Sequence, residues 1–300
     1  MIGAGPAAAE ADSGARPLEP GLRPFDLVLA WYFGTLAALI AAFAGDIPEA
    51  SRWFVVHAGG ALAALLLPVA TRRLPAASAL AIRFAAAYLL VLVAFNALGR
   101  LVEFLSPDDR EWYLIALDRR LFGGDPTLAL RAVAHPALTE LLQLVYASFY
   151  FLPIVLGGAL ARARDWRAFE FSLTAVALGF LLSYLGYFLV PARGPERFLP
   201  HGEPLEGVAT ASAVRAWLDR VVPVKRDCFP SGHTEISLLV AALAWRFHRP
   251  AFLLLGPVAL LLAFSTVYLR YHYAVDVLAG AALAGAALIA TGRLMRPLRG

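Results

Sequence analysis

Apolar runs long enough to cross a lipid bilayer constrain this chain more than any other feature. The hydrocarbon layer is about 30 Å thick, so a spanning helix needs about 20 mostly apolar residues. Hydrophobic residues make up 60% of the 300 residues and charged residues only 16%, with a mean hydropathy of +0.68. This composition excludes an ordinary soluble domain and predicts an all-α, polytopic membrane helical bundle. We expect about eight spans, the second and sixth of them short, at about 25–45, 53–70, 79–101, 137–160, 168–190, 233–248, 251–268 and 274–292.

The basic residues predict how the spans are oriented. The chain has 25 arginines and a single lysine, Lys225, against 22 acidic residues. If eight spans alternate, the short arginine-rich turns and both termini fall on one side, which the positive-inside rule makes cytoplasmic. These arginines are Arg72, Arg73, Arg162, Arg164, Arg167, Arg246, Arg249, Arg293, Arg296 and Arg299. The segments 102–136, 191–232 and 269–273 then face the extracytoplasmic side.

Composition also predicts the cellular location of the protein. Residues 1–23 are rich in Ala, Gly and Pro and lack the pattern of a signal peptide, so we expect a disordered cytoplasmic tail. Abundant Ala and Arg with one lysine is typical of a GC-rich bacterial genome, which predicts the bacterial inner membrane. Membrane topology explains the clustered arginines, and we expect no nucleic-acid partner.

The sequence contains no pattern of metal ligands. Cys228 is the only cysteine, which excludes an intramolecular disulfide and cysteine-based metal sites. His57, His135, His201 and His248 show no metal-ligand spacing. We therefore expect neither a metal nor another cofactor.

The segment Pro230–His233 reads Pro-Ser-Gly-His and precedes an apolar run. Proline and serine favour the first positions of a helix, where free N–H groups bind phosphate. Ser231 and Gly232 are therefore candidate phosphate ligands, because Gly232 would let a ligand approach the backbone closely. The alternative is a plain helix cap beside an interfacial histidine.

A second polar motif, Tyr271–Asp276, lies at another membrane boundary. His272 and Asp276 are four residues apart and share a helix face, so the carboxylate can accept the Nδ1 proton and leave Nε2 free to attack. His233 is then the natural proton donor to a leaving group. Arg270 fits as a fork for phosphate oxygens. The alternative is a helix-capping ion pair among interfacial tyrosines, although ionisable residues at a boundary are costly unless they pair or face a wet cavity.

Cations in the long loop 191–232 extend the candidate site. Arg193, flanked by Gly194, is a candidate second phosphate clamp, with Arg197 as the fallback. Lys225 is either a phosphate ligand or a surface charge. The loop is long enough to fold over the mouth of a site.

Polar residues near other outer span ends leave two readings open. Glu103, Glu140 and Gln143 either line a cavity or cap helices. The amphipathic stretch Asp118–Pro126 is expected to lie along the outer membrane interface as one or two helices.

The two histidine motifs resemble the second and third signatures of the type-2 phosphatidic acid phosphatase superfamily. The resemblance covers roughly 110–285 and implies a six-span catalytic core at 79–295, with two additional spans at 24–78. It also implies that His272 forms a phosphohistidine, that Asp276 orients it and that His233 protonates the leaving oxygen. The family needs no metal, in agreement with the missing ligands.

Two departures from the phosphatase pattern indicate a particular branch. Thr266 stands where an arginine is usual, six residues before His272, and the first signature is replaced by Arg193-Gly194-Pro195. Together with Asp118-x-x-Leu-Phe-Gly-x-Asp-Pro126, these departures resemble the fungal-type inositol phosphorylceramide synthases.

We therefore expect a membrane enzyme that takes a phosphoryl or phospho-head group from a lipid phosphate through a phosphohistidine, which water or an alcohol then resolves. The first alternative is an inositolphosphotransferase-type synthase that moves a phospho-alcohol onto a lipid acceptor. A second, of another class, is a non-catalytic lipid-binding or transport protein on the same fold. A soluble haloperoxidase with the same anion site is excluded by the eight expected spans.

Overall fold

The computed structural model describes residues 21–106, 108–221 and 226–295. Within these ranges the ordered elements are helices, and β-type pairing is limited to an isolated bridge between Ala192 and Asp227. The all-α prediction is confirmed. Of the tail expected at 1–23, residues 1–20 lie outside the described residues. Gly21–Arg23 lead into the first helix.

Among the described residues, seven segments are long and apolar enough to cross a membrane, at positions close to seven of the eight predicted spans. They comprise α1 (Pro24–Ala42), α2 (Ala50–Ala70), α3 (Ala76–Leu105), the unit made of α6 (Pro136–Ala147), η3 (Ser148–Phe151) and α7 (Leu152–Arg162), then α8 (Trp166–Leu189), α11 (Arg249–Tyr268) and α12 (Ala274–Leu294). The second span was expected to be short, and this was wrong, because α2 has 21 residues.

The eighth predicted span is α10 (Gly232–Phe247), whose 16 residues give a helix about 24 Å long. It packs against α7, α8, α11 and α12 and forms the centre of the bundle. Because its neighbours are protein on most sides, it tolerates buried polar residues such as Thr234, Glu235 and Ser237. A central helix of this kind need not present a full membrane-spanning apolar surface to lipid.

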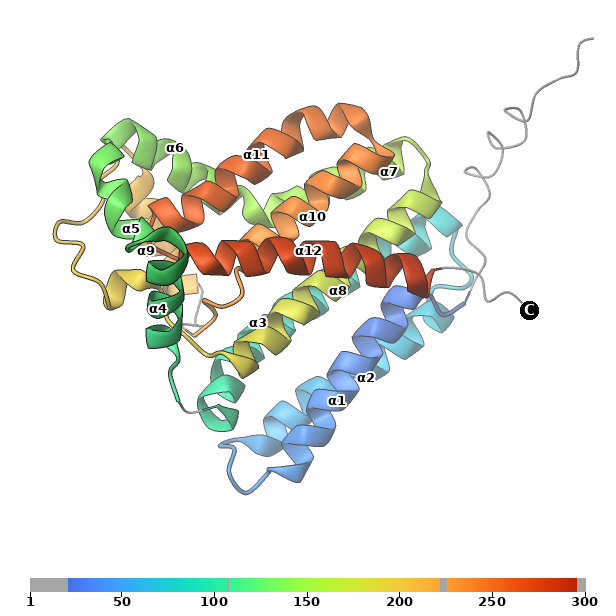
Figure 1. The fold of residues 1–300 in the computed structure, drawn as a ribbon. Coiled ribbons are helices and arrows are strands. Elements are labelled where there is room, and N and C mark those ends of the chain that lie inside the picture. The colour runs from blue at the N-terminus through green and yellow to red at the C-terminus, as the bar shows by residue number, and fades with distance from the viewer. Residues whose placement is uncertain (1–20, 107, 222–225, 296–300) are drawn as a thin grey trace, which may run out of the picture.

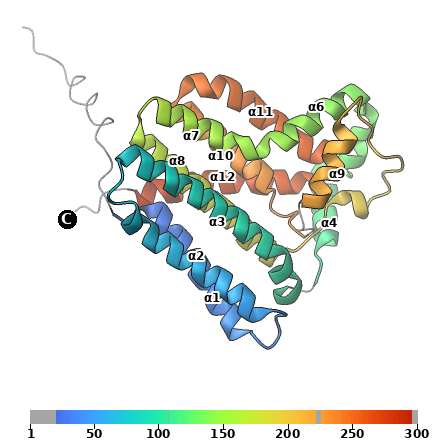
Figure 2. The same ribbon diagram turned by 180° about the vertical axis from the view of Figure 1, so that it is seen from behind.

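The connecting elements gather at one end of the bundle. After α3 come α4 (Glu111–Phe122), α5 (Pro126–Ala129) and η2 (Leu130–Val133), and between α8 and α10 come η4 (Pro195–Arg197) and α9 (Ala211–Val221). Figure 1 shows α4, α5 and α9 together at the left end, while the turns after α7 and α10 lie towards the other end. The view from behind shows the same separation of the two ends (Figure 2).

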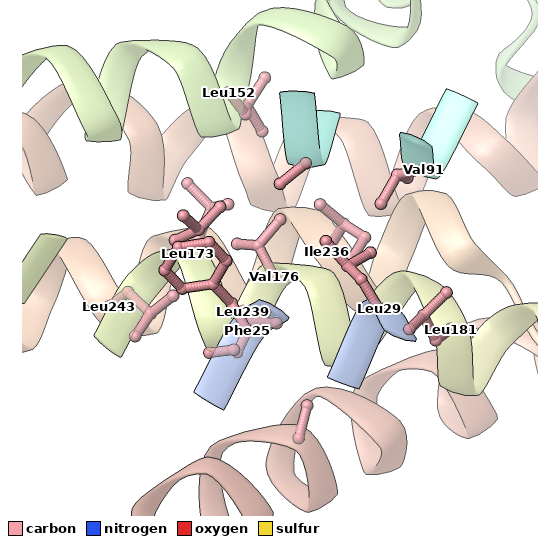
Figure 3. Packing of buried hydrophobic residues seen from close by; sticks show 14 of the residues in the cluster. Phe25, Leu29, Val91, Leu152, Leu173, Val176, Leu181, Ile236, Leu239 and Leu243 are labelled. Atoms are coloured by element: carbon pink, nitrogen blue, oxygen red, sulfur yellow. The ribbon is translucent and has the colours of Figure 1, made fainter. Parts of the chain in front are cut away.

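Leucine, isoleucine and valine side chains from α1, α3, α7, α8 and α10 fill the core. Figure 3 shows Leu29, Val91, Leu173 and Leu239 converging between the helices, and each of these side chains is buried. Burial of such apolar surface is the main favourable contribution to packing at the centre of the bundle.

A buried ionic cluster joins the first span to the helices behind it. Arg83 of α3 pairs with Asp26 of α1, and Arg23, just before α1, lies 3.5 Å from Glu170 of α8. Asp26, Arg83 and Glu170 are all buried. Charges so far from water need partners, so this cluster fixes α1 against α3 and α8.

Candidate active site

A cavity of about 490 Å³ opens where the loops after α8 and α11 meet α3, α6, α9 and the start of α10. Its histidines and cations are Arg193, Arg197, His233, Arg270 and His272. The motifs that the sequence analysis singled out therefore meet at one cavity. Leu218 and Asp219 of α9 also line it, so part of the loop 191–232 does cover the site.

Hydrogen bonding fixes the tautomer of His272. Its Nδ1 atom lies 2.7 Å from the carbonyl oxygen of Cys228, and because a carbonyl can only accept, Nδ1 carries the proton. In the neutral ring, Nε2 is then the unprotonated nitrogen with a free lone pair. His272 lines the cavity although only 4% of its surface is exposed.

The four-residue spacing predicts that the Asp276 carboxylate accepts the Nδ1 proton of His272, and the structure shows a different arrangement. Its Oδ2 atom lies 3.4 Å from Nδ1 of His272, which is longer than the bond to Cys228. The same oxygen accepts from the Cys228 thiol at 2.9 Å and from the Tyr273 N–H at 2.9 Å. Asp276 thus stabilises the Cys228 segment and the start of α12, and at 3.4 Å its contact with His272 is longer than the bond from His272 to the Cys228 carbonyl.

Cys228 is the site residue that the sequence reasoning missed. As the only cysteine it served to exclude a disulfide and cysteine-based metal sites, yet its carbonyl orients His272 and its thiol donates to Asp276. Burial, followed by the negative Asp276, raises the pKa of the thiol well above its usual range, so the thiol stays a donor. The only signal in the sequence was its position five residues before His233.

His233 lies in an aromatic stack. Its ring centroid is 4.4 Å from that of Tyr146 and 4.3 Å from that of Phe149, and Tyr146 stacks in turn on Tyr271 at 4.4 Å. The rings of His233 and His272 have centroids 5.7 Å apart. The break between α6 and α7 at η3 brings Phe149 to this position, which sequence periodicity did not indicate.

Ser231 and Gly232 have roles in packing. The Ser231 hydroxyl caps α10 by accepting from the Thr234 N–H, and its own N–H donates to the carbonyl of Asp276 at 3.1 Å. A Cβ on Gly232 would lie 2.6 Å from the hydroxyl of Tyr187, so any larger residue here would have to displace this side chain of α8. As the first two helical residues, Gly232 and His233 keep N–H groups without an acceptor in the helix. These two amides, and not that of Ser231, remain as candidate phosphate donors.

The arginines differ in how firmly they are held. The Arg193 N–H donates to Glu111 at 2.9 Å, and its side chain lies 3.9 Å from Asp109, whereas Arg197 is exposed. Arg270 is 5% exposed, has a φ of 67° and donates to the carbonyl of Glu203 at 3.1 Å. Burial lowers the pKa of Arg270, but an arginine remains charged after such a shift. Lys225 lies outside the described residues.

The structure separates the two readings for the polar residues at span ends. Glu103 lines the cavity. Glu140 accepts from the N–H groups of Val208, Ala209, Thr210 and Ala211 and from the Thr210 hydroxyl, so it caps α9. Gln143 accepts from the Tyr271 hydroxyl at 3.3 Å and supports the aromatic stack.

Among the described residues, Cys228, His272 and Asp276 also form a group that could hold a metal ion, since their ligand atoms lie within 4.8 Å of one another. In the present arrangement the thiol and Nδ1 both donate hydrogen bonds. A metal ion would have to displace both protons, because ligands bind in the deprotonated form. The donor set therefore favours a hydrogen-bonded histidine over a metal centre.

Together, the fold and the cavity define a polytopic helical membrane protein with paired histidines and arginines at one end of the bundle. The sequence pattern of the PAP2 superfamily matches residues 112–290, and the chain belongs to this superfamily. The matched residues begin in α4 and include every histidine and arginine of the cavity.

One curated relative is the PA-phosphatase related-family protein of Dictyostelium discoideum. It is 29% identical to this chain over 165 residues, which cover 47% of this chain and 30% of that relative. The chain thus matches less than a third of the relative's length. No solved structure matches.

Proposed function

We propose that this protein is a membrane lipid phosphatase or phosphotransferase in which His272 forms a phosphohistidine. The observation that carries the proposal is the meeting of His233, His272, Arg193 and Arg270 at one cavity, within a chain of the PAP2 superfamily. The name of the Dictyostelium relative, which refers to PA-phosphatase, supports a lipid phosphate as the substrate class.

In the proposed first step, Nε2 of His272 attacks phosphorus and the bond from phosphorus to the leaving oxygen breaks. His233, in its protonated form, gives its proton to that oxygen. Arg193, Arg270 and the amides of Gly232 and His233 stabilise the charge on the equatorial oxygens, as positioning and electrostatics dominate phosphoryl transfer. Lys225 and Ser231 complete the set expected from the sequence, and Ser231 acts as the helix cap.

In the second step, water attacks the phosphohistidine, His233 accepts a proton from that water, and inorganic phosphate leaves with His272 restored. A transferase would differ from a phosphatase only in this second step, in which an alcohol attacks the phosphohistidine in place of water. Inositolphosphotransferase-type transfer is favoured by Thr266, by the Arg193-Gly194-Pro195 segment and by the Asp118–Pro126 motif. A cavity of about 490 Å³ is also in the range that holds whole small molecules.

A panel of labelled lipid phosphates, assayed in proteoliposomes with and without inositol-type donors and alcohol acceptors, tests this function. His272→Ala serves as the inactive control. Free phosphate released only by the wild type supports a phosphatase, and label on a new lipid supports a transferase. Binding of lipid phosphate without release or transfer would contradict both and favour the non-catalytic reading.

The loop arginines provide a graded test of phosphate binding. We expect Arg193→Ala to lower kcat/KM by a factor on the order of 10 to 100, because it removes a charge-assisted bond from a residue whose backbone is fixed by Glu111. Arg197→Ala, at an exposed position, should have the smaller effect. Arg120→Ala, an exposed arginine on α4, is the control. A larger loss for Arg197→Ala than for Arg193→Ala would reassign the clamp.

The arginine pattern supports a site on the extracytoplasmic side of a bacterial inner membrane, with both termini in the cytoplasm. We expect a green fluorescent protein fused after residue 300 to fluoresce in the producing cells, because this reporter folds in the cytoplasm. Alkaline phosphatase at the same junction should stay inactive. An active alkaline phosphatase fusion would reverse the orientation.

The division of the chain follows the same proposal. Residues 79–295 form the six-helix catalytic core, and 24–78 supply two additional spans. The family match begins at residue 112, so it leaves α1 and α2 outside, and α3 as well. Phosphate release by a chain that lacks residues 1–78 would uphold this division, and a folded but inactive product would oppose it.

A further inference from the structure

Helix α4 turns its acidic residues inward and most of its large apolar residues outward. Glu111 and Asp118 are 5% and 2% exposed, whereas Trp112 and Leu121 are 59% and 56% exposed. An amphipathic helix at a membrane interface ordinarily turns its charged residues to water. Buried carboxylates are costly unless they are hydrogen-bonded, so their partners indicate why they are there.

The partners of Asp118 belong to the segment of the proposed nucleophile. Its Oδ1 accepts from the Val275 N–H at 2.8 Å and its Oδ2 from the Ala274 N–H at 3.0 Å. These are the first residues of α12, whose N–H groups have no acceptor inside the helix. They follow His272 by two and three residues. Burial raises the pKa of Asp118, and these two N–H bonds counteract that shift by favouring the ionised form.

The other acidic residue of α4 contacts the opposite part of the site. Glu111 Oε1 accepts from the Arg193 N–H at 2.9 Å, and the N–H of Arg110, the residue before the helix, donates to the Pro191 carbonyl at 2.9 Å. Helix α4 has only 12 residues and is a single rigid element. It therefore fixes the loop of Arg193 relative to the start of α12.

We propose that Asp118 and Glu111 are positioning residues that set the relative places of His272 and Arg193, and that this is why the Asp118–Pro126 motif begins with an aspartate. The proposal rests on the function proposed above for His272 and Arg193. Neither carboxylate lines the cavity, so both act through the backbone of the segments that do.

Asp118→Asn is the sharpest variant, because it keeps the shape of the side chain and places an NH₂ group against one of the two N–H donors. We expect kcat on lipid phosphate to fall by a factor on the order of 10² while KM changes by less than about threefold, since small displacements of reacting groups slow chemistry. The amides of residues 274 and 275 should exchange hydrogen faster. Asp125→Asn, in the same motif but paired with the exposed Arg119, is the matched control and should behave like wild type.

Hydrogen exchange measured by mass spectrometry on the whole chain in detergent, beside kinetics and thermal melting, separates the outcomes. Unchanged kcat in Asp118→Asn, or faster exchange spread over all helices, would overturn the proposal. If Asp118→Asn does not fold, Glu111→Ala should show faster exchange at residue 193 and a lower kcat/KM, and unchanged values would overturn it. If even wild type neither releases nor transfers phosphate, the proposed function fails, and hydrogen exchange at residues 274 and 275 still decides whether Asp118 holds this segment.

Discussion

Replacing His272 with Ala is expected to reduce turnover of lipid phosphate by a factor of about 10³ or more, because the proposed mechanism places the covalent intermediate on Nε2 of this residue. The loss should appear in kcat. The Nδ1 bond to the Cys228 carbonyl leaves Nε2 as the attacking atom, and alanine provides no nitrogen at that place. Phosphate release under single-turnover conditions measures this step directly.

The control for this variant is His248→Ala. His248 caps α11 at the opposite end of the bundle, far along the chain from the cavity residues, and should retain activity within about threefold. His272→Ala must also melt close to the temperature of wild type in detergent. Turnover near the wild-type rate in a folded His272→Ala protein would eliminate the phosphohistidine mechanism.

Replacing His233 with Ala is expected to produce a loss that depends on the leaving group. With a lipid phosphate, whose alkoxide leaves poorly, we expect kcat/KM to fall by a factor of about 10² to 10⁴, the usual contribution of a general acid. With an aryl phosphate such as p-nitrophenyl phosphate, whose leaving group needs no proton, the loss in kcat/KM should be much smaller. The measurement is kcat/KM on both substrates for wild type and variant, because kcat/KM reports formation of the phosphohistidine and not its hydrolysis.

Stacking against Tyr146 and Phe149 makes a second change at this position informative. Phe in place of His233 keeps an aromatic ring in the stack but has no proton to give. We expect His233→Phe to show the same dependence on leaving group as His233→Ala, with better thermal stability. Equal losses on both substrates would argue that His233 only shapes the cavity.

Much of the fold follows from the sequence because membrane spans are encoded locally. Length and apolar content predict α1 to α3, α8, α11 and α12, since a spanning helix must satisfy its backbone internally and face lipid. Helix α10 departs from this rule. Its place at the centre of the bundle depends on the packing of four other helices, which no local pattern reports.

The site was predictable only in part, for a similar reason. His233 and His272 stand in motifs, so their roles could be proposed from spacing and resemblance. The carbonyl of Cys228 and the ring of Phe149 reach the histidines through tertiary contacts between distant segments. Spacing alone led to a direct Asp276–His272 pair, whereas the nearer acceptor is a backbone atom.

The positioning role of α4 left a faint signal in the sequence. Glu111, Leu114 and Asp118 lie at spacings of three and four residues, so they share one helical face, and all three are buried. Two acidic residues on the same face as a buried leucine indicate carboxylates turned toward protein. Their partners in the Arg193 loop and at the start of α12 could not be identified without the fold.

The central claim is the covalent intermediate on His272, and trapping it is the most direct test. Wild-type protein in proteoliposomes is mixed with lipid phosphate labelled on phosphorus, quenched rapidly in alkali, where phosphohistidine is stable, and analysed by peptide mass spectrometry. The account predicts label on the peptide that contains His272, and this label should be lost on brief acid treatment and absent from His272→Ala. With a labelled aryl phosphate as substrate, His233→Ala should carry more label than wild type, because transfer of the phosphoryl group to water is slowed. Turnover of substrate with no labelled protein, or label on another residue, would contradict it.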